Sequence, residues 1–328
     1  MFRWGIIGLG RIAHKFAQEL TQTSLGVVGA AASRDLAKAE DFTALYGGVP
    51  YGDYDDFISD ASVDAVYVAV PHHLHFVLAS KCIEKGIPVL CEKPFTINLH
   101  QSEALVALAR ARSVFLMEAM WTRFMPHILW LNEFCRQGSL GHMLHLKAEF
   151  CFKGKERGLT QGVSRLLQNE LGGGALLDIG IYPIFLSLLL LGGPDEINAQ
   201  AVIVNDIDES CNLLFKYNRG TTAYLESSIM YESAGQAILY FEQGSIIIPL
   251  RWHESNEIWI LRPDGSKEIK KWDYPSRGFY YEMKEVQECV EADQKESKLM
   301  PLDFSLELTS TLDRVRKIIG LHYPADLG

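Results

Sequence analysis

The sequence has few of the features that mark secreted, disulfide-bonded or metal-bound proteins. Its six cysteines are dispersed and include no Cys-x-x-Cys pair. Most of them stand inside apolar runs, where a cysteine behaves as a small buried hydrophobic residue. This usage is typical of a reducing compartment, so we expect a cytoplasmic protein.

Long apolar runs and a secretory leader are also lacking. The most apolar run, Ile184–Leu191, is much shorter than the roughly 20 residues that span a bilayer. The opening residues, MFRWGIIGLG, lack the charged flank, long apolar stretch and cleavage site of a signal peptide. We expect a soluble protein with no membrane partner.

Basic residues are in the minority. The chain has 31 basic and 41 acidic residues, for a net charge of −10. This balance disfavours nucleic acid and anionic membrane as partners. With 328 residues, 48% of them hydrophobic, the chain can form about two domains with sizeable cores. It shows no internal repeat.

The first 120 residues alternate short apolar strands with amphipathic helices. Strands are predicted at 2–7, 26–32, 64–70, 87–91 and 113–117, and helices at 11–21, 36–46, 74–85 and 99–112. Apolar strands separated by helices indicate a parallel sheet that is covered on both faces. With right-handed connections, this order predicts a Rossmann-type, doubly wound α/β domain over residues 1–122.

The pattern changes after Pro126. A helix at 127–137, a strand at 143–152 and a helical run at 171–191 come first, and two helices at 278–291 and 304–319 finish the chain. Strands with short turns lie between them, at 197–204, 211–217, 221–230, 236–242, 245–249, 257–262 and 267–271.

This order predicts an α+β domain over residues 123–328, with a large, mostly antiparallel sheet. Helices would cover one face of that sheet and leave the other open, as a surface for homodimerisation. The C-terminal helix can pack back on the first domain.

The stretch GIIGLGRIAHKFAQEL places a glycine turn between the first strand and the first helix. Gly8 permits a tight turn, Gly10 lets the backbone approach a pyrophosphate, and Ala13 lets the helix pack close to the strand. The helix N-terminus at Arg11 and Ile12 offers N–H groups to the anion. The sequence therefore predicts a dinucleotide site.

The second strand ends at ASRD, and this end predicts the type of cofactor. Ser33 and Arg34 offer a hydroxyl and a guanidinium, which suit the 2′-phosphate of NADP. In the alternative interpretation, Arg34 is exposed to solvent and Asp35 only caps the next helix. Asp35 could also bind the ribose 2′-hydroxyl, which would favour NAD.

Three histidines follow the third strand, in VAVPHHLHF. The carboxyl ends of parallel strands form the ligand-binding edge of such a sheet, so we expect Pro71, His72 and His75 to contact the cofactor. His75 could instead start a helix or serve in packing. A metal site is not expected, because no cysteine or acid stands at a spacing that would complete it.

VLCEKPFTIN places Glu92 and Lys93 at the carboxyl end of the fourth strand. Pro94 restricts Lys93 to an extended backbone. From position alone, Lys93 could be a solvated residue. Because the glycine turn predicts a nicotinamide along this edge, we expect both Glu92 and Lys93 to lie at the cofactor.

Four motifs together resemble a known family. GIIGLGRIA, CEKPFTIN and GGGALLDIGIYP, in this order, resemble the Gfo/Idh/MocA oxidoreductases. EAMWTRFMP, at 118–126, narrows the resemblance to the branch that contains dimeric dihydrodiol dehydrogenases and D-xylose dehydrogenases. The resemblance covers nearly the whole chain and implies the same two-domain layout and a dimer.

The resemblance also implies catalytic residues. The lysine of the family's Glu-Lys-Pro motif corresponds to Lys93, and a cis Lys93–Pro94 bond is expected. The family's Asp-x-x-x-His pair corresponds to Asp178 and Tyr182, with tyrosine in place of histidine, as in the dihydrodiol branch.

Chemistry supports these roles, because hydride transfer at an alcohol carbon requires proton movement at its oxygen. Tyr182 is the predicted acid/base, and Lys93 would stabilise its phenolate and lower its pKa. Asp178, four residues away, would orient the pair or bind substrate. Two alternatives stay open: Lys93 itself carries the proton, or Tyr182 is a core aromatic on an apolar helix.

Substrate contacts are expected from aromatic and basic residues near the domain junction. The candidates are Trp121, Arg123, Phe152, Arg165 and Phe279. An aromatic cleft suits an apolar ring diol or the carbon face of a sugar.

The segment SRLLQNELGGG departs from the branch. It has Gln168 and Asn169 before Glu170, where the branch has an arginine, a proline and an acidic residue. The sequence thus predicts an NADP-dependent oxidoreductase, with NAD as the alternative cofactor, that acts on a trans-dihydrodiol or a cyclic sugar. The alternative function is a catalytically silent NADP-binding sensor.

Overall fold

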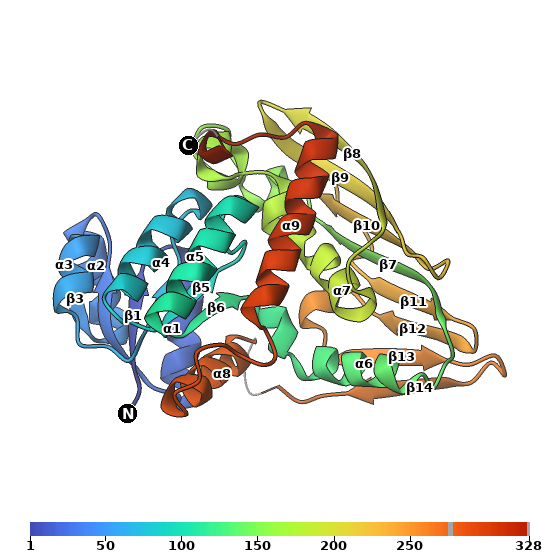
Figure 1. Cartoon of the computed structure of the whole chain (residues 1–328), viewed down its shortest axis with the longest axis horizontal. Coiled ribbons are helices and arrows are strands. Elements are labelled where there is room, and N and C mark those ends of the chain that lie inside the picture. Colours follow the sequence, from blue (N-terminus) through green and yellow to red (C-terminus); the bar gives the residue numbers. More distant parts are fainter. Residues whose placement is uncertain (275–277, 327–328) are drawn as a thin grey trace. The chain divides into compact units, whose positions relative to one another are not determined.

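The chain forms two compact units. The computed structural model describes residues 1–274 and 278–326. One unit combines Met1–Phe124 with Tyr274–Leu306, and the other combines Met125–Asp273 with Glu307–Gly328 (Figure 1). Each unit has its own sheet.

The first unit is built on a six-stranded parallel sheet in the order β3-β2-β1-β4-β5-β6. Its strands are β1 (Arg3–Ile7), β2 (Val27–Ala32), β3 (Val49–Tyr51), β4 (Ala65–Val68), β5 (Val89–Glu92) and β6 (Leu116–Ala119). Its helices are α1 (Arg11–Thr23), α2 (Leu36–Tyr46), α3 (Tyr54–Asp60), α4 (His75–Glu84), α5 (Leu99–Arg112) and α8 (Phe279–Glu291). The strand order reverses between β1 and β4, which is where this fold binds dinucleotides.

The predicted doubly wound sheet is confirmed, and it has one strand and one helix more than expected, β3 and α3. The sequence patterns did not indicate β3 or α3. β3 has three residues and α3 has seven, so neither is long enough to show a clear hydrophobic period.

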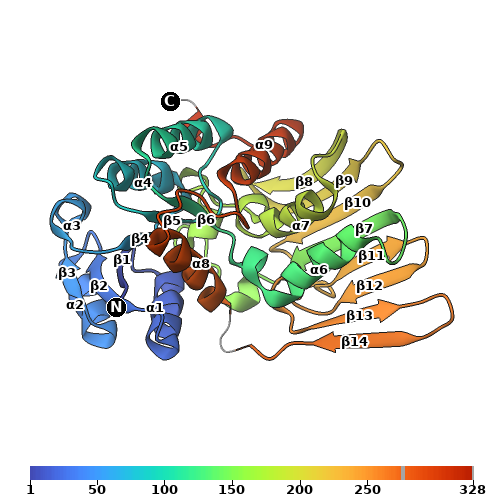
Figure 2. The same ribbon diagram turned by 60° about the horizontal axis from the view of Figure 1, so that its bottom comes forward.

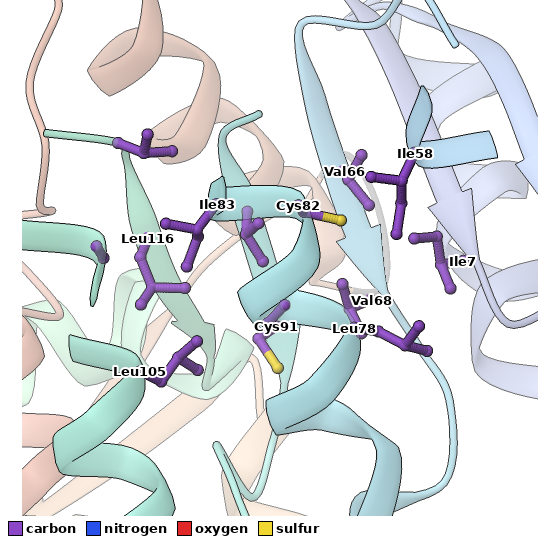
Figure 3. Close-up of a cluster of buried hydrophobic side chains, with 14 of the residues drawn as sticks. Ile7, Ile58, Val66, Val68, Leu78, Cys82, Ile83, Cys91, Leu105 and Leu116 are labelled. Carbon is purple, nitrogen blue, oxygen red and sulfur yellow. The ribbon is translucent and has the colours of Figure 1, made fainter. Parts of the chain in front are cut away.

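The core on one side of this sheet consists of branched aliphatic side chains and cysteines. Val66, Val68, Leu78 and Leu116 pack there with Cys82 and Cys91 (Figure 3). Both thiols are fully buried, and burial raises the pKa of Cys82 to about 12. The interpretation of cysteine as a small apolar residue is therefore confirmed at these two positions.

The segment 274–306 belongs to the first unit, whereas the sequence prediction assigned all of 123–328 to the second domain. The ring of Phe279 lies edge-on to Phe16 of α1 at 6.3 Å between centroids. The backbone N–H of Tyr280 donates to Glu19 Oε2 at 3.1 Å. Sequence periodicity predicts helix α8 but does not indicate which core its apolar face joins.

The second unit holds an eight-stranded sheet in the order β14-β13-β12-β11-β7-β10-β9-β8. Its strands are β7 (Met143–Cys151), β8 (Glu196–Val204), β9 (Ile207–Lys216), β10 (Thr222–Ser228), β11 (Ala237–Phe241), β12 (Gly244–Ile248), β13 (Glu257–Leu261) and β14 (Lys267–Lys271). All neighbouring strands are antiparallel except β7 and β10, which are parallel. The predicted large, mostly antiparallel sheet is confirmed.

Helices cover one face of this sheet. α6 (Pro126–Gln137) and α7 (Ile181–Leu191) lie across it in both views (Figures 1 and 2). α9 (Leu302–Ile319) is divided between the units: Leu302 and Leu306 pack in the core of the first, and residues from Glu307 onward belong to the second.

A single long apolar segment leads into α7. Among the residues that the structure describes, Asn169–Leu191 is the one helical stretch long and apolar enough to cross a membrane, by length and composition only. The sequence prediction considered only Ile184–Leu191 and therefore judged the run too short. Of the most apolar window in Asn169–Leu191, 78% is buried inside the protein, as in the core helix of a globular domain.

Candidate active site

The glycine turn between β1 and α1 forms an open cradle. Gly8 has φ +90°, and a Cβ there would lie 2.6 Å from the carbonyl oxygen of Ala69, so only glycine fits. A Cβ at Gly10 would meet no atom within 4 Å. α1 begins at Arg11, followed by half-buried Ile12, with no side-chain cap and no acid in its first turn. The predicted pyrophosphate site therefore has both the space and the free helix N-terminus that a dinucleotide requires.

The end of β2 carries the residues predicted to read the cofactor's ribose. Ser33 Oγ accepts the N–H of Asp35, and Asp35 Oδ1 accepts the N–H of Ala37 as the N-cap of α2. Arg34 is exposed. Both features of the alternative interpretation are therefore observed: Asp35 caps α2, and Arg34 is exposed.

Two residues missed by the sequence analysis face Arg34. The Arg34 charge is one of the causes that shift the pKa values of both Tyr54 and His73, from the first turn of α3 and from the turn after β4. Burial is the larger cause in each: it raises the pKa of Tyr54 and lowers that of His73. His73 Nδ1 is buried and has no hydrogen-bond partner within residues 1–274 and 278–326. Arg34 follows β2, Tyr54 follows β3 and His73 follows β4. The three residues are far apart in the sequence, so their proximity is seen in the fold and not in a sequence motif.

Two of the three histidines after β4, His72 and His75, are buried. His75 is fully buried, and its two ring nitrogens lie 2.9 Å from the carbonyl oxygen of Val70 and 2.8 Å from that of Pro94. The prediction that His75 contacts the cofactor is wrong, because both nitrogens are held by backbone. His72 is also buried, at 4% exposure, and Pro71 is half-buried before it.

Glu92 and Lys93 stand at the carboxyl end of β5. Glu92 is 7% exposed; its Oε1 accepts the hydroxyl of Tyr67, and its Oε2 accepts the backbone N–H of Lys93 at 3.0 Å. The Lys93–Pro94 bond is cis, as the resemblance implies. Lys93 is half-buried at this edge. Because its N–H donates to Glu92, its backbone is held by the side chain of the residue before it.

The turn that follows Lys93 is anchored to β6. The backbone N–H of Phe95 donates to Glu118 Oε1 at 2.9 Å, and Glu118 is 1% exposed. Burial raises the pKa of Glu118 to about 7, against smaller lowering effects from its hydrogen bonds. One buried carboxyl thus fixes the chain two residues beyond the lysine.

Two of the predicted substrate residues meet in the first unit. The rings of Trp121 and Phe279 stack, with centroids 5.9 Å apart. Arg123 does not join them at the surface: it is 7% exposed, and its Nε donates to the carbonyl oxygen of Leu299 at 2.7 Å. Its guanidinium therefore binds the backbone at Leu299, and the predicted substrate contact of Arg123 is not supported.

Asp178 lies in a π-helical turn, Leu176–Gly180, that precedes α7. Arg165 Nη2 donates to Asp178 Oδ1 at 2.6 Å, and both side chains are partly exposed. The predicted face shared by Asp178 and Tyr182 therefore spans a junction between π and α geometry, where the four-residue rule for a regular helix does not strictly apply.

Tyr182 lies on the first turn of α7, in an aromatic group. Its ring centroid is 5.4 Å from that of Phe150 and 5.3 Å from that of His253, and those two rings stack at 4.3 Å. Phe150 and His253 also line a cavity of about 80 Å³. The sequence analysis missed His253, because 71 residues separate it from Tyr182 and no local motif marks it.

Phe152, another predicted substrate residue, lies in an apolar cluster of the second unit. It is 8% exposed and packs with Leu166, Ala175, Ile179 and Ile229 in an apolar cluster. The guanidinium of Arg157 lies over its ring at 4.5 Å. Phe152 is thus a core residue that supports the turn before Asp178.

The candidate residues fall into two groups, one in each unit. The first unit collects the glycine turn, Arg34, Lys93 and the Trp121–Phe279 stack, and the second collects Asp178 with Arg165 and Tyr182 with His253. Within residues 1–274 and 278–326, no group of three histidine, cysteine or acidic side chains could hold a metal ion.

Comparison with known proteins identifies the family. Residues 2–120 match the family described as "Oxidoreductase family, NAD-binding Rossmann fold", and residues 128–247 match the "GFO/IDH/MocA C-terminal domain". The chain belongs to the Gfo/Idh/MocA oxidoreductase family. The predicted resemblance is therefore confirmed over both units.

Several curated relatives share the whole length of this Gfo/Idh/MocA chain. Trans-1,2-dihydrobenzene-1,2-diol dehydrogenase of Danio rerio is 33% identical over 338 residues, covering 99% of this chain and 98% of that protein. The human enzyme of the same name is 33% identical over 343 residues, with the same coverage. The dihydrodiol branch named from the sequence is thus among the similar proteins.

Solved structures agree with this assignment. The 3-ketoreductase KijD10 from Actinomadura kijaniata, in complex with NADP and TDP-benzene, superposes with a TM-score of 0.87 at 28% identity, covering 97% of this chain and 98% of that one. The aldose-aldose oxidoreductase of Caulobacter crescentus has a TM-score of 0.86 at 22% identity, over 97% of each chain, and shows the shared fold. The protein is an NAD(P)-binding oxidoreductase of this family.

Proposed function

We propose that the protein is an NADP-dependent dehydrogenase that transfers hydride between nicotinamide C4 and a hydroxyl-bearing carbon of a trans-dihydrodiol or a cyclic sugar. One observation carries the proposal: Lys93 stands at the carboxyl end of β5, at the same sheet edge as the open cradle at Gly10. A bound nicotinamide supplies the hydride acceptor along this edge.

The choice of NADP rests on the end of β2. The Arg34 guanidinium lies there near Tyr54 and His73, and Asp35 Oδ1 accepts the N–H of Ala37 at the start of α2. A planar, permanently charged guanidinium suits a 2′-phosphate. The complex of KijD10 with NADP, at 28% identity, supports this choice.

The proposed roles of the side chains follow from the chemistry at oxygen. Oxidation of the alcohol requires a group that accepts the hydroxyl proton as the hydride leaves carbon. We assign this proton to the Tyr182 phenol, and we assign stabilisation of the resulting phenolate to the Lys93 ammonium. Asp178, through its ion pair with Arg165, would orient the substrate hydroxyl.

The proposed substrate class rests on a pair of stacked rings in each unit. The Trp121–Phe279 stack and the Phe150–His253 stack are aromatic pairs, and aromatic rings suit the flat face of a dihydrodiol or the carbon face of a sugar. The names of the relatives, which are dihydrodiol dehydrogenases at 33% identity, support the diol. KijD10, a 3-ketoreductase, supports a sugar-like carbonyl or alcohol.

A substrate panel tests the proposal. Purified protein is assayed with NADP⁺ and NAD⁺ against trans-dihydrodiols, cyclic aldoses and their keto products, and the measurement is repeated with Tyr182→Phe and Lys93→Met. We expect turnover with NADP⁺ on one of these classes and a loss of about a hundredfold or more in kcat for each variant.

The matched controls are Tyr46→Phe and Lys38→Met, two substitutions of the same type on α2. Turnover near the wild-type rate in Tyr182→Phe and Lys93→Met would refute the assigned roles. Tight binding of NADP without turnover of any compound would instead favour the sensor.

We also propose that the protein works as a homodimer through the uncovered face of the eight-stranded sheet. Side chains alternate along each strand, so every second residue points to this face. It displays apolar groups on four of its strands, among them Leu214, Tyr240, Ile247 and Ile269. An apolar surface of this kind is typical of a protein–protein interface.

A further inference from the structure

Three glutamates gather on one side of the parallel sheet in the first unit. Glu19 comes from α1, Glu92 from the end of β5 and Glu282 from α8, and their exposed fractions are 6%, 7% and 0%. A chain of contacts links them: Glu19 accepts the N–H of Tyr280 at the start of α8, Phe16 contacts both Phe279 and Tyr67, and Tyr67 donates to Glu92. The ring of Tyr67, stacked on Phe16 at 4.1 Å, closes the group from β4.

The hydrogen bonds in this group are distributed unevenly. Glu92 accepts the Tyr67 hydroxyl and the Lys93 N–H, and Glu19 accepts the N–H of Tyr280. Glu282 receives none: both of its carboxyl oxygens are buried and without a hydrogen-bond partner among the described residues.

This distribution decides where the negative charge lies. An ionised carboxylate without donors is very costly to bury, and two adjacent carboxylates repel each other. Burial, followed by the charges of Glu92 and Glu19, raises the pKa of Glu282 well above its usual range. Glu92, which has two donors, is the carboxylate of the pair, and Glu282 carries the proton.

We propose that Glu282 is a positioning residue for Lys93: the protonation state of Glu282 controls the position of Lys93. While Glu282 is neutral, Glu92 stays an undisturbed acceptor for the Lys93 N–H. When Glu282 ionises, a second negative charge appears beside Glu92 in a dry site. Repulsion then displaces the Glu92 carboxylate, and the position of Lys93, whose N–H donates to it, changes as well. The inference rests on the proposed function only in assuming that Lys93 acts in the reaction.

The placement of α8 gives this arrangement a consequence for activity. The helix begins with Phe279, which stacks on Trp121, and its first turn also carries Glu282. Because both residues stand in the first turn of one helix, ionisation of Glu282 disturbs the Trp121–Phe279 stack together with Lys93. Activity should therefore fall on the alkaline side as Glu282 loses its proton.

The test compares Glu282→Gln, which imitates the neutral acid, with Glu282→Asp, which still ionises. Protein labelled with ¹³C-lysine is titrated by NMR, and the Lys93 signal is identified from its absence in Lys93→Met. Glu118, whose pKa is about 7 and whose charge acts on Lys93, should give the Lys93 signal one titration step in every variant. In the wild type and Glu282→Asp, we expect a further titration step that Glu282→Gln lacks. Glu285→Gln, a substitution of the same type in the same helix, should retain the step.

Kinetics gives the second readout. The pH profile of kcat/KM should fall by about tenfold per pH unit above the pKa of Glu282 in the wild type. In Glu282→Gln that fall should begin at least about one pH unit higher. A Lys93 signal and a pH profile that are both unchanged in Glu282→Gln would overturn the inference. Absence of any turnover would refute the proposed function alone, because the NMR step does not depend on turnover.

Discussion

His75 shows how a single buried side chain can hold the turn that carries Lys93. Its ring nitrogens bridge the carbonyl oxygens of Val70, after β4, and Pro94, after β5. A neutral imidazole donates to one of these carbonyls, and a doubly protonated one donates to both. Because the site is dry, no water can replace the ring without a change in structure.

Replacing His75 by alanine should therefore destabilise the protein. At least one buried carbonyl group would lose its hydrogen-bond donor, at about 1–3 kcal/mol for each unsatisfied group. We expect the free energy of unfolding to fall by about 3 kcal/mol, measured by urea denaturation followed by circular dichroism. His100→Ala, at an exposed position on α5, is the matched control and should change it by less than about 0.5 kcal/mol. Equal stability of the two variants would contradict the bridging role.

Arg34 is the residue on which the choice of cofactor depends. Arg34→Ala should weaken NADPH binding by about ten- to a hundredfold, because a charge-assisted hydrogen bond contributes about 1.5–3 kcal/mol. Binding of NADH, which has no 2′-phosphate, should stay the same. Quenching of protein fluorescence measures both constants. Lys38→Ala removes an equal charge from α2 and serves as the control; parallel losses for NADPH and NADH in Arg34→Ala would contradict the assignment.

At the scale of elements, the ends of β4, β5 and β6 are tied together by side chains rather than by the sheet alone. Tyr67 in β4 bonds Glu92 at the end of β5, and Glu118 in β6 bonds the N–H of Phe95 in the turn after β5. The loop that carries Lys93 is thus fixed from both neighbouring strands. A rigid support of this kind is what a catalytic group requires.

The Glu118 anchor should give the stability a pH dependence. Its pKa is about 7 in the folded protein, against 4.5 for an unperturbed glutamate, with burial as the main cause. A raised carboxyl pKa contributes stability that is fully present below about pH 4.5 and is lost as the pH rises to about 7. The loss for this group is about 3 kcal/mol.

Glu118→Gln keeps an oxygen for the N–H of Phe95 but cannot ionise. Its free energy of unfolding should therefore vary less than that of the wild type between pH 5 and pH 8, as measured by urea denaturation at several pH values. Glu103→Gln, at an exposed position of α5, should follow the wild type. A wild-type slope retained in Glu118→Gln would show that another group titrates.

Elements whose hydrophobic pattern extends over several repeats could be predicted from the sequence. Contacts between elements that are distant in the chain could not. The glycine turn and the Glu-Lys-Pro motif predicted the ends of β1 and β5, because each motif and its strand are adjacent in the chain. The Arg165–Asp178 ion pair and the packing of His253 on Tyr182 depend on how loops and helices meet. Such contacts leave no periodic pattern in the sequence.

For the whole molecule, the same reasoning explains the error in the domain boundary. The chain returns to the first unit at Tyr274, long after it leaves that unit at Phe124. The sequence of α8 shows an amphipathic helix, but an apolar face can pack on any core. The contacts of Phe279 with Phe16 and of Tyr280 with Glu19 show which core it joins.

The open sheet face leads to the last prediction, on the assembly of the molecule. In a dimer with twofold symmetry, the same surface meets itself, so one substitution alters the interface twice. Tyr240 stands on β11, in the middle of the sheet order, and is 43% exposed in the single chain. Tyr240→Lys would bring two like charges into an apolar interface, where their burial is costly.

We therefore expect the wild type to sediment as a dimer and Tyr240→Lys as a monomer in analytical ultracentrifugation. Leu45→Lys is the control, because Leu45 is more exposed, at 69%, but lies on α2 of the first unit; it should remain a dimer. A monomeric wild type, or a Tyr240→Lys variant that still dimerises, would show that this face has another role. Since the substitution lies outside the described cofactor cradle, NADPH binding by the monomer would separate assembly from cofactor recognition.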